Sequence, residues 1–295
     1  MLLLKVAILS LLHPQQVTVN NIVITRQGGQ LDVDGQRQAS YLSRGRFQIR
    51  VAPDFRRTYT GQLEITSKNS ELQLILTATE DDLIAAIVSA ESPGAALPAA
   101  LEAQAIVARS WLRASRRRHG HYDLCDTTHC QHFKEPAPQG VRAAAATRNL
   151  VLLWQGKPFA PAYSASCGGR TRSAAAIGWR DEGAYPYFSV ECPICLRNEP
   201  EWTRHFDGDG AATLRAHPHS EAARLALGRR LGWDALPSNN YELTESPNGL
   251  LLKGRGSGHG LGYCQKGAAG LARQGRSPAE ILRHYFPGTN IMSRQ

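Results

Sequence analysis

Cysteine and histidine side chains gather in two short stretches of this chain of 295 residues. The stretch HGHYDLCDTTHCQHF, residues 119–133, holds Cys125 and Cys130 among four histidines, and a second stretch reads Cys192-Pro-Ile-Cys195. Cysteines at such short spacings beside histidines are typical of zinc knuckles, and a tetrahedral zinc site needs four such ligands. We therefore expect a structural metal site with ligands from both stretches. Two disulfides in an exported protein, or a redox-active CxxC motif, are the alternatives.

Glycine is dense around His259. The stretch GRGSGHGLGYCQKGAAGLARQG, residues 254–275, has four glycines between residues 256 and 262 and continues into an alanine-rich segment. Glycine allows a positive φ and lets another molecule approach the main chain closely. The stretch is therefore either a turn from a strand to a helix or the wall of a binding site.

The net charge of +9 favours contact with polyanions such as nucleic acid, anionic membrane surfaces and acidic cell-wall polymers. The arginines are nevertheless spread along the chain. The one dense basic patch, residues 113–121, has no interleaved aromatic residues for base stacking. We therefore expect no nucleic-acid partner.

No apolar run reaches the roughly 20 residues of a membrane-spanning helix, so we expect no integral membrane segment. The apolar start of the chain, MLLLKVAILSLL, is interrupted by Lys5 and is followed by no small-residue cleavage site, so it gives no clear signal peptide. A first β-strand explains this start at least as well.

The elements that position these residues change in type near residue 79. Residues 1–78 alternate apolar and polar side chains between breaks of Gly, Pro, Asn and Ser, which predicts strands and hairpins. EDDLIAAIVSAE, residues 80–91, has apolar residues at helical spacing and acids in its first turn. This helix should end at residues 91–94, ESPG, because Pro93 disfavours a helical residue before it.

A second helix should begin at Pro98 and place alanine and leucine on one face. SPAEILRHYFPG, residues 277–288, predicts a helix with a capping box formed by Ser277 and Glu280. Residues 196–253 predict a helix and a hairpin, inserted in a larger domain. The expected fold is mixed α+β, with one domain over residues 79–295 and a strand-rich portion, residues 1–78, packed on it.

Five motifs in one order resemble the SpoIID/LytB family of peptidoglycan-acting proteins. Residues 85–111, AAIVSAESPGAALPAALEAQAIVARSW, are similar to the opening signature of the family, in which an acidic residue ends one helix and an EAQA-rich helix begins the next. The other motifs are YDLCDTTHCQ, YSASCGGRT, YPYFSV, and GRGSGHGLGYCQKGA with ILRHYFPGT after it. The resemblance spans residues 80–290, and residues 1–78 share only a strand-rich character.

The resemblance implies a lytic transglycosylase that cuts the glycan strands of peptidoglycan stripped of stem peptides. Glu91 matches the catalytic glutamate of the family. It would protonate the glycosidic oxygen and then, as a base, take a proton from the sugar's own 6-hydroxyl, which closes an anhydro ring. A general acid needs a raised pKa, and a helix end, at the negative pole of the dipole, agrees with that need. The alternative is a solvated glutamate at a helix end.

The resemblance also implies residues that bind the glycan strand. His259 and Gln265 match the GHG and Gln positions of the family and are interpreted as hydrogen-bonding groups in a glycan groove; a packed core histidine is the alternative for His259. Arg109 would either contact sugar oxygens or form a structural ion pair. Hydroxyl groups and glycines of YSASCGGRT would complete the set: Tyr163, Ser164, Ser166, Gly168 and Gly169.

In zinc-bearing relatives the ligands correspond to Cys125, His129 and Cys130, with His119 as the candidate for the fourth. Cys192 and Cys195, whose motif is not general in the family, could instead replace the histidines and give a four-cysteine site. Either set closes the coordination of the metal and leaves no position for an activated water, so structural zinc is expected.

A different class of function comes from the LytB branch, whose members are described as amidase enhancers. Under that interpretation the chain binds glycan without cutting it, activates a partner cell-wall amidase, and uses Glu91 for recognition only. A zinc hydrolase of peptide or amide bonds is a third alternative, but the chain lacks the HExxH arrangement. Peptidoglycan as the substrate implies an extracytoplasmic site of action, in sporulation, division or general wall remodelling.

Overall fold

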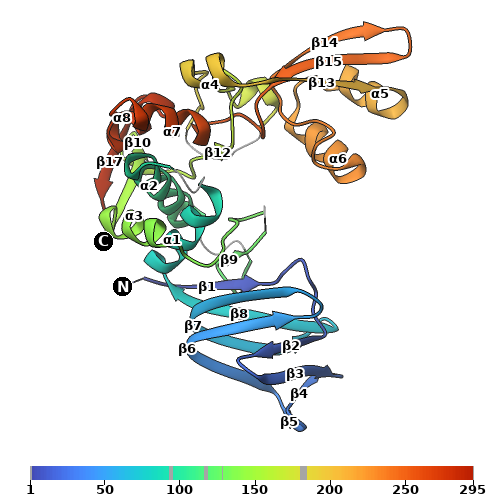
Figure 1. Cartoon of the computed structure of the whole chain (residues 1–295), viewed down its shortest axis with the longest axis vertical. Helices are drawn as coiled ribbons and strands as arrows, with labels where there is room; N and C mark the ends of the chain where they lie inside the picture. The colour runs from blue at the N-terminus through green and yellow to red at the C-terminus, as the bar shows by residue number, and fades with distance from the viewer. Residues whose placement is uncertain (1, 93–95, 116–118, 128, 180–184, 295) are drawn as a thin grey trace. The chain divides into compact units, whose positions relative to one another are not determined.

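A computed structural model describes residues 2–92, 96–115, 119–127, 129–179 and 185–294 (Figure 1). The fold is mixed α+β, as the sequence predicts. The chain forms two compact units that alternate along the sequence. The first unit contains residues 1–94 and 115–148, and the second contains residues 95–114 and 149–295. The domain boundary expected between residues 78 and 79 stays a prediction.

One sheet dominates the first unit, and its strands follow the predicted alternation of apolar and polar residues. Every second residue of β8 (Glu71–Thr79), from Leu72 to Ala78, is buried. The apolar start of the chain forms β1 (Leu3–Ile8), which pairs antiparallel with β8 and parallel with β9 (Leu124–Cys125). In the described residues the strand order is β5-β4-β3-β2-β6-β7-β8-β1-β9. The other strands are β2 (Gln16–Val19), β3 (Ile22–Gln27), β4 (Gln30–Val33), β5 (Gln36–Gln38), β6 (Ser40–Val51) and β7 (Phe55–Lys68).

The first helix, α1 (Glu80–Glu91), begins and ends where the sequence predicts. The Thr79 hydroxyl accepts a hydrogen bond from the Asp82 N–H and caps the helix, and acidic residues occupy the first turn, near the positive end of the dipole. The helix then runs through buried residues to its end at Glu91. Pro93 and Gly94, the predicted helix-ending residues, lie outside the described residues.

A second helix of the first unit, α3 (Pro138–Ala146), packs closely on α1 (Figure 1). The close packing needs Gly140, because a Cβ there would overlap the Ser89 hydroxyl. That hydroxyl is itself held, since it donates to the Ala85 carbonyl at 2.7 Å. The contact therefore fixes the last turns of α1, which end at Glu91.

The second unit is built around α2 (Pro98–Ala114), which begins at the predicted proline. Small residues of α2 share one buried core with α8 (Pro278–Tyr285). The predicted capping box begins α8: Ser277 Oγ accepts from the Glu280 N–H, and the Glu280 carboxylate accepts from the Ser277 N–H. The other elements around α2 are β10 (Leu150–Trp154), β11 (Lys157–Pro158), β12 (Tyr163–Ser164), a short 3-10 helix (Ala175–Ile177), α4 (Pro193–Asn198), β16 (Tyr263–Cys264), α7 (Gln265–Arg273) and β17 (Thr289–Ser293).

Within the second unit a small sheet and two helices form a core of their own. The predicted helix and hairpin are present as α6 (Glu221–Leu231) and the pair β14 (Tyr241–Ser246) and β15 (Gly249–Arg255). The sequence did not predict β13 (Glu201–Phe206), which pairs with the other edge of β15, or α5 (Gly208–Ala216). Two glycines among the nine residues of α5 weaken its helical pattern.

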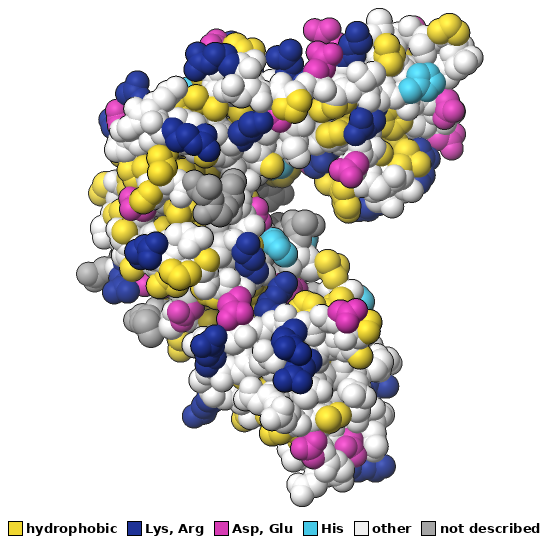
Figure 2. Space-filling model, in the orientation of Figure 1, with side chains coloured by type: hydrophobic (Ala, Val, Ile, Leu, Met, Phe, Trp, Pro, Cys, Tyr) yellow, Lys and Arg dark blue, Asp and Glu magenta, His cyan; other side chains and the backbone are white. Residues whose placement is uncertain are grey.

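Basic side chains on the face drawn in Figure 2 are scattered among acidic ones over both units. Three ion pairs of the chain join Arg148 to Asp81, Arg215 to Glu245, and Lys266 to Glu199. The middle of the dense basic patch, residues 116–118, lies outside the described residues. Among the helices that are described, none has both the length and the apolar character needed to cross a membrane.

Candidate functional site

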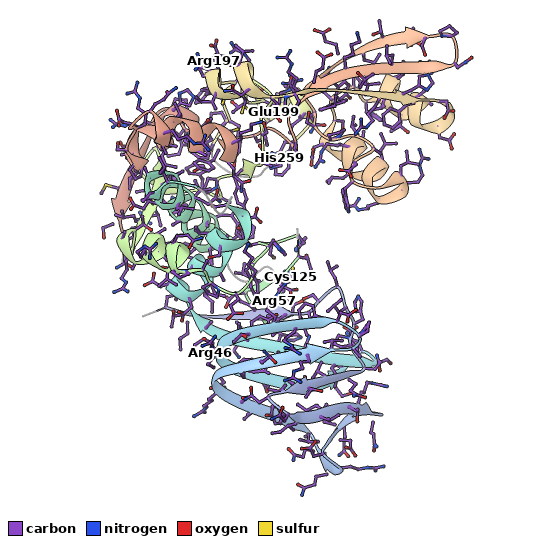
Figure 3. All side chains as sticks on the ribbon, in the orientation of Figure 1. Arg46, Arg57, Cys125, Arg197, Glu199 and His259 are labelled. Atoms are coloured by element: carbon purple, nitrogen blue, oxygen red, sulfur yellow. The ribbon has the colours of Figure 1, made fainter. Side chains whose placement is uncertain are left out.

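Four potential metal ligands meet beside β9 in the first unit, and we refer to His119, Cys125, His129 and Cys130 as the His/Cys group. Figure 3 labels Cys125 of this group. Their ligand atoms all lie within 4.8 Å of one another. The Cys130 sulfur is 3.1 Å from His119 Nε2 and 3.5 Å from His129 Nδ1. Two sulfurs and two imidazole nitrogens at such separations fit a tetrahedral zinc ion with all four positions filled by protein.

Backbone pairing with β1 positions the His/Cys group. Cys125 is the last residue of β9, which lies parallel to β1. Two carboxylates fasten the flanking turns, since Asp123 accepts from the Lys5 N–H at 2.9 Å and Asp126 accepts from the Leu9 N–H at 2.7 Å. The edge of the sheet thus places the loop that carries the ligands.

A second group of potential ligands lies in the second unit. The sulfurs of Cys167, Cys192, Cys195 and Cys264, here called the four-cysteine group, are buried and lie within 4.8 Å of one another. Hydrogen bonds among these thiols lower the pKa of Cys192 and raise the pKa of Cys167. The ligands that the sequence analysis combined in one site therefore fall into two groups, one in each unit.

The four glycines between residues 256 and 262 all have positive φ, from 63° to 93°. They also clear space for another segment of the chain. A Cβ on Gly256 would lie 2.6 Å from the Ser166 carbonyl oxygen, and a Cβ on Gly262 would overlap the Ala162 carbonyl oxygen. Ser166 and Ser257 exchange backbone hydrogen bonds of 2.8 and 3.1 Å across the contact. The dense glycine pattern is thus explained by close backbone packing.

The predicted glycan-binding residues of YSASCGGRT mostly serve internal packing. The Ser166 hydroxyl is buried and donates to the Cys195 sulfur at 3.5 Å. Gly168 and Gly169 have positive φ, and a Cβ on either would crowd a neighbouring segment, at Arg255 and Leu196 respectively. Their role as glycan contacts stays a prediction.

Tyr163 and Ser164 form β12, which pairs parallel with β16 and sets Ser164 opposite Cys264. The Ser164 hydroxyl oxygen is buried and has no hydrogen-bond partner within the described part of the chain. A Cβ on Gly258 would lie 3.2 Å from the Cβ of Ser164. This unsatisfied hydroxyl lies beside the glycine-rich segment and is a candidate donor to a ligand.

His259, which is labelled in Figure 3, is half-buried, and backbone groups form hydrogen bonds with its ring. The Leu261 N–H donates to His259 Nδ1 at 2.9 Å, so the proton of the neutral ring is on Nε2. Burial lowers the pKa of His259 to about 4, and a backbone hydrogen bond with Tyr163 acts in the opposite direction. The geometry is that of a neutral histidine that stabilises the loop, and its contact with glycan stays a prediction.

Two side chains near His259 were not predicted as site residues. The Trp179 ring lies 5.3 Å from the His259 ring, centroid to centroid. Arg172 donates its backbone N–H to the Gly260 carbonyl, and its buried Nε has no hydrogen-bond partner in the described residues. An indole face and an arginine donor are suited to a sugar ring and to an anionic oxygen. Arg172 could have been found in the sequence, because it directly follows YSASCGGRT.

The predicted acid and the predicted glycan-binding residues belong to different units. Glu91 is the half-buried last residue of α1, in the first unit. Gln265 is the half-buried first residue of α7, in the second unit. Arg109, on α2, is fully buried, which favours a structural role for its guanidinium.

Comparison with known proteins agrees with the motifs. A family model described as SpoIID, stage II sporulation protein, matches residues 68–154. This segment of the chain is similar to the SpoIID family. The matched SpoIID segment runs from the last residue of β7 to the last residue of β10, so it contains Glu91 and the His/Cys group. The four-cysteine group lies outside it.

Proteins similar to this chain come from several bacteria. Stage II sporulation protein D of Bacillus amyloliquefaciens is 28% identical over 256 residues, which cover 72% of this chain and 73% of that protein. An uncharacterized protein of Brachyspira hyodysenteriae is 28% identical over 272 residues, 79% of this chain and 72% of that protein. A Bacillus subtilis protein named amidase enhancer is 33% identical over 63 residues, 21% of this chain and 9% of that protein.

Close packing at the glycine-rich segment predicts that Gly262→Ala is more destabilising than Gly275→Ala. Both glycines have positive φ, which costs an alanine about 1 to 2 kcal/mol. Only Gly262 also faces a neighbouring carbonyl, and relief of that overlap should add about 1 to 3 kcal/mol, whereas a Cβ on Gly275 meets no atom within 4 Å. Urea unfolding of the two variants measures the difference, and equal losses would contradict the packing argument.

The lowered pKa of His259 predicts an acid-dependent stability. In the unfolded chain the histidine has its ordinary pKa near 6.5, whereas in the folded chain its pKa is about 4. Between these pH values the unfolded chain binds a proton that the folded chain does not, so the free energy of unfolding decreases as the pH falls from about 6.5 to about 4. His259→Gln removes this dependence. Unfolding free energies at pH 7 and pH 4.5 should therefore fall more steeply for wild type than for the variant. His217→Gln, at an exposed position, is the control, and parallel slopes for wild type and His259→Gln would refute the prediction.

Proposed function

We propose that this chain is a peptidoglycan lytic transglycosylase that uses Glu91 as its acid and its base. The observation that carries the proposal is the position of Glu91, the half-buried last residue of a largely buried helix, within the segment that matches the SpoIID family model. The similarity to proteins named stage II sporulation protein D supports the assignment. A peptidoglycan substrate implies action outside the cytoplasm.

The packing of α1 supports a catalytic position for Glu91. The helix is held by the sheet at its start and by α3 near its end, where Ser89 and Gly140 are in close contact. A carboxyl group at the end of such a helix has a fixed backbone, and catalytic groups gain rate from being held in place before the substrate binds. Its half-buried side chain can be reached by a glycan strand and still be partly shielded from water.

The proposed reaction needs one carboxyl group and no water. Protonated Glu91 gives its proton to the glycosidic oxygen while the bond from that oxygen to the anomeric carbon breaks, which leaves a transition state with oxocarbenium character. The carboxylate then removes the proton of the 6-hydroxyl on the same sugar, and O6 bonds to the anomeric carbon. The products are an anhydro-sugar end and a free hydroxyl on the leaving sugar. Glu91 is protonated again at the end of the cycle.

The second unit has its own proposed glycan contacts, which are inferred from its side chains and motifs alone. Ser164 and Arg172 offer donors without partners in the described residues, and Trp179 offers a ring face for a sugar. Tyr163, His259 and Gln265 remain proposed contacts from the family motifs. In this proposal Ser166, Gly168, Gly169 and Arg109 shape the binding surface from within the packed unit.

The His/Cys group is proposed to hold a structural zinc ion. Four protein ligands complete the tetrahedral coordination, so the ion, when bound, stabilises the loop after β9 and offers no site for an activated water. Proton transfer in the proposed reaction stays with Glu91.

An amidase enhancer is the second candidate function. It is favoured by the similarity over 63 residues to a Bacillus subtilis protein with that name. In this case the chain binds glycan strands, leaves them uncut and increases the activity of a separate cell-wall amidase.

Digestion of purified peptidoglycan, intact and amidase-treated, distinguishes the two functions. Wild type should release fragments with anhydro-sugar ends, detected by mass spectrometry. Glu91→Gln should reduce the rate by at least about 100-fold, because an amide cannot donate the proton. Glu135→Gln is the matched control in the same unit, because Glu135 is exposed and pairs only at the surface with Arg46, so it should keep the wild-type rate.

Two outcomes would count against the transglycosylase. Equal rates for wild type and a folded Glu91→Gln variant would remove Glu91 from the chemistry. Binding of the glycan by wild type without any soluble product, together with faster turnover by an added cell-wall amidase, would establish the enhancer function instead.

A further inference from the structure

We infer that the four-cysteine group binds a zinc ion of its own, separate from the His/Cys group and located in the second unit. The sulfurs of Cys167, Cys192, Cys195 and Cys264 are buried and lie within 4.8 Å of one another. The inference does not rest on the transglycosylase proposal, because it concerns the stability of the second unit whichever reaction the chain performs.

The separations among the sulfurs fit a single metal ion. Zinc binds thiolate sulfur at about 2.3 Å in a tetrahedron, which places neighbouring sulfurs about 3.8 Å apart. The Cys195 and Cys264 sulfurs are 3.5 Å apart. An iron–sulfur cluster holds its cysteines further apart, because inorganic sulfides and several irons lie between them. Cys192 and Cys195 supply the two-residue spacing of a zinc knuckle.

Polar donors surround the sulfurs, as is usual for thiolates bound to a metal. The Cys264 sulfur accepts from the N–H groups of Cys167 and Gly267, both at 3.3 Å. The Ser166 hydroxyl donates to the Cys195 sulfur, and the Tyr285 hydroxyl is 3.3 Å from the Cys192 sulfur. Hydrogen bonds to the sulfurs stabilise the negative charge of a buried thiolate.

The residue that faces the four sulfurs from α7 is a glycine, and its lack of a side chain leaves room for the four-cysteine group. Gly267, in the first turn of α7, faces the sulfurs, and a Cβ there would overlap the Cys192 sulfur and the Tyr285 hydroxyl. Tyr285 lies fully buried on the next helix. Two helices are therefore shaped around the four sulfurs.

The ion would fasten three separate segments: the turn after β12, the first turn of α4 and the start of α7. The turn after β12 and the start of α7 lie next to the contact between residues 162–168 and residues 256–262. Zinc in the four-cysteine group is thus positioned to hold the glycine-rich segment, with His259, against its neighbour.

A zinc count on the full-length chain tests the inference. Cys192→Ser/Cys195→Ser should contain one zinc ion fewer per chain than wild type. The matched variant Cys125→Ser/Cys130→Ser disrupts the His/Cys group and leaves the four-cysteine group intact, so it should retain one ion. Absence of zinc from this second variant, or iron in its place, would overturn the inference.

X-ray absorption on Cys125→Ser/Cys130→Ser keeps the test independent of whether the other variant folds. The expected first shell is four sulfurs at about 2.3 Å, and a shell with nitrogen or oxygen would contradict it. Alkylation of this protein after denaturation without reductant should label Cys167, Cys192, Cys195 and Cys264. Protection from alkylation would reveal disulfides and refute the metal site.

The same variant tests the effect of the ion on the glycine-rich segment. Removal of zinc with a chelator should speed amide hydrogen exchange in residues 256–264 and leave exchange in β6 and β7, in the first unit, unchanged. Equal exchange before and after chelation would contradict the proposed role of the ion in holding the segment.

Discussion

The second unit depends on a steric constraint between two backbones. Residues 256–262 run so close to residues 162–172 that side chains cannot stand between them, and glycine with positive φ is the residue that meets both demands. Two other features of the unit follow from this contact. It holds the ring of His259 between backbone groups, and it brings Cys264 opposite the strand that leads to Cys167.

Strands of only two residues position members of both the His/Cys group and the four-cysteine group. Cys125 ends β9, Cys264 ends β16, and Cys167 follows β12 by three residues. Strand pairs this short contribute few backbone hydrogen bonds, so neighbouring contacts must stabilise them. Carboxylates accept hydrogen bonds from the backbone beside β9, and glycines pack closely beside β12 and β16. A metal ion that binds such loops stabilises the folded state, because the unfolded chain has no assembled site for the ion.

The sequence predicts what depends on neighbours along the chain. Alternation predicted the strands of the first 78 residues, a change of period predicted α1 with Glu91 at its end, and Ser277 with Glu280 predicted the start of α8. The grouping of cysteines was not predictable in this way. Cys167 and Cys264 are 97 residues apart, and no local pattern reports that β12 and β16 pair. The glycines of residues 256–262 indicated a close approach, but only the structure identifies the chain's own backbone as the molecule that approaches.

The alternation of the two units along the chain limits how the molecule can be divided. α2 belongs to the second unit, yet segments of the first unit precede and follow it. The polypeptide passes from one unit to the other after residues 94, 114 and 148. A single cut therefore releases neither unit whole, and a fragment that begins at residue 149 lacks its central helix. Neither unit is encoded by one continuous stretch of the gene. A recombination event that exchanges the second unit between relatives must therefore exchange the segment that encodes α2 as well as the segment that encodes residues 149–295.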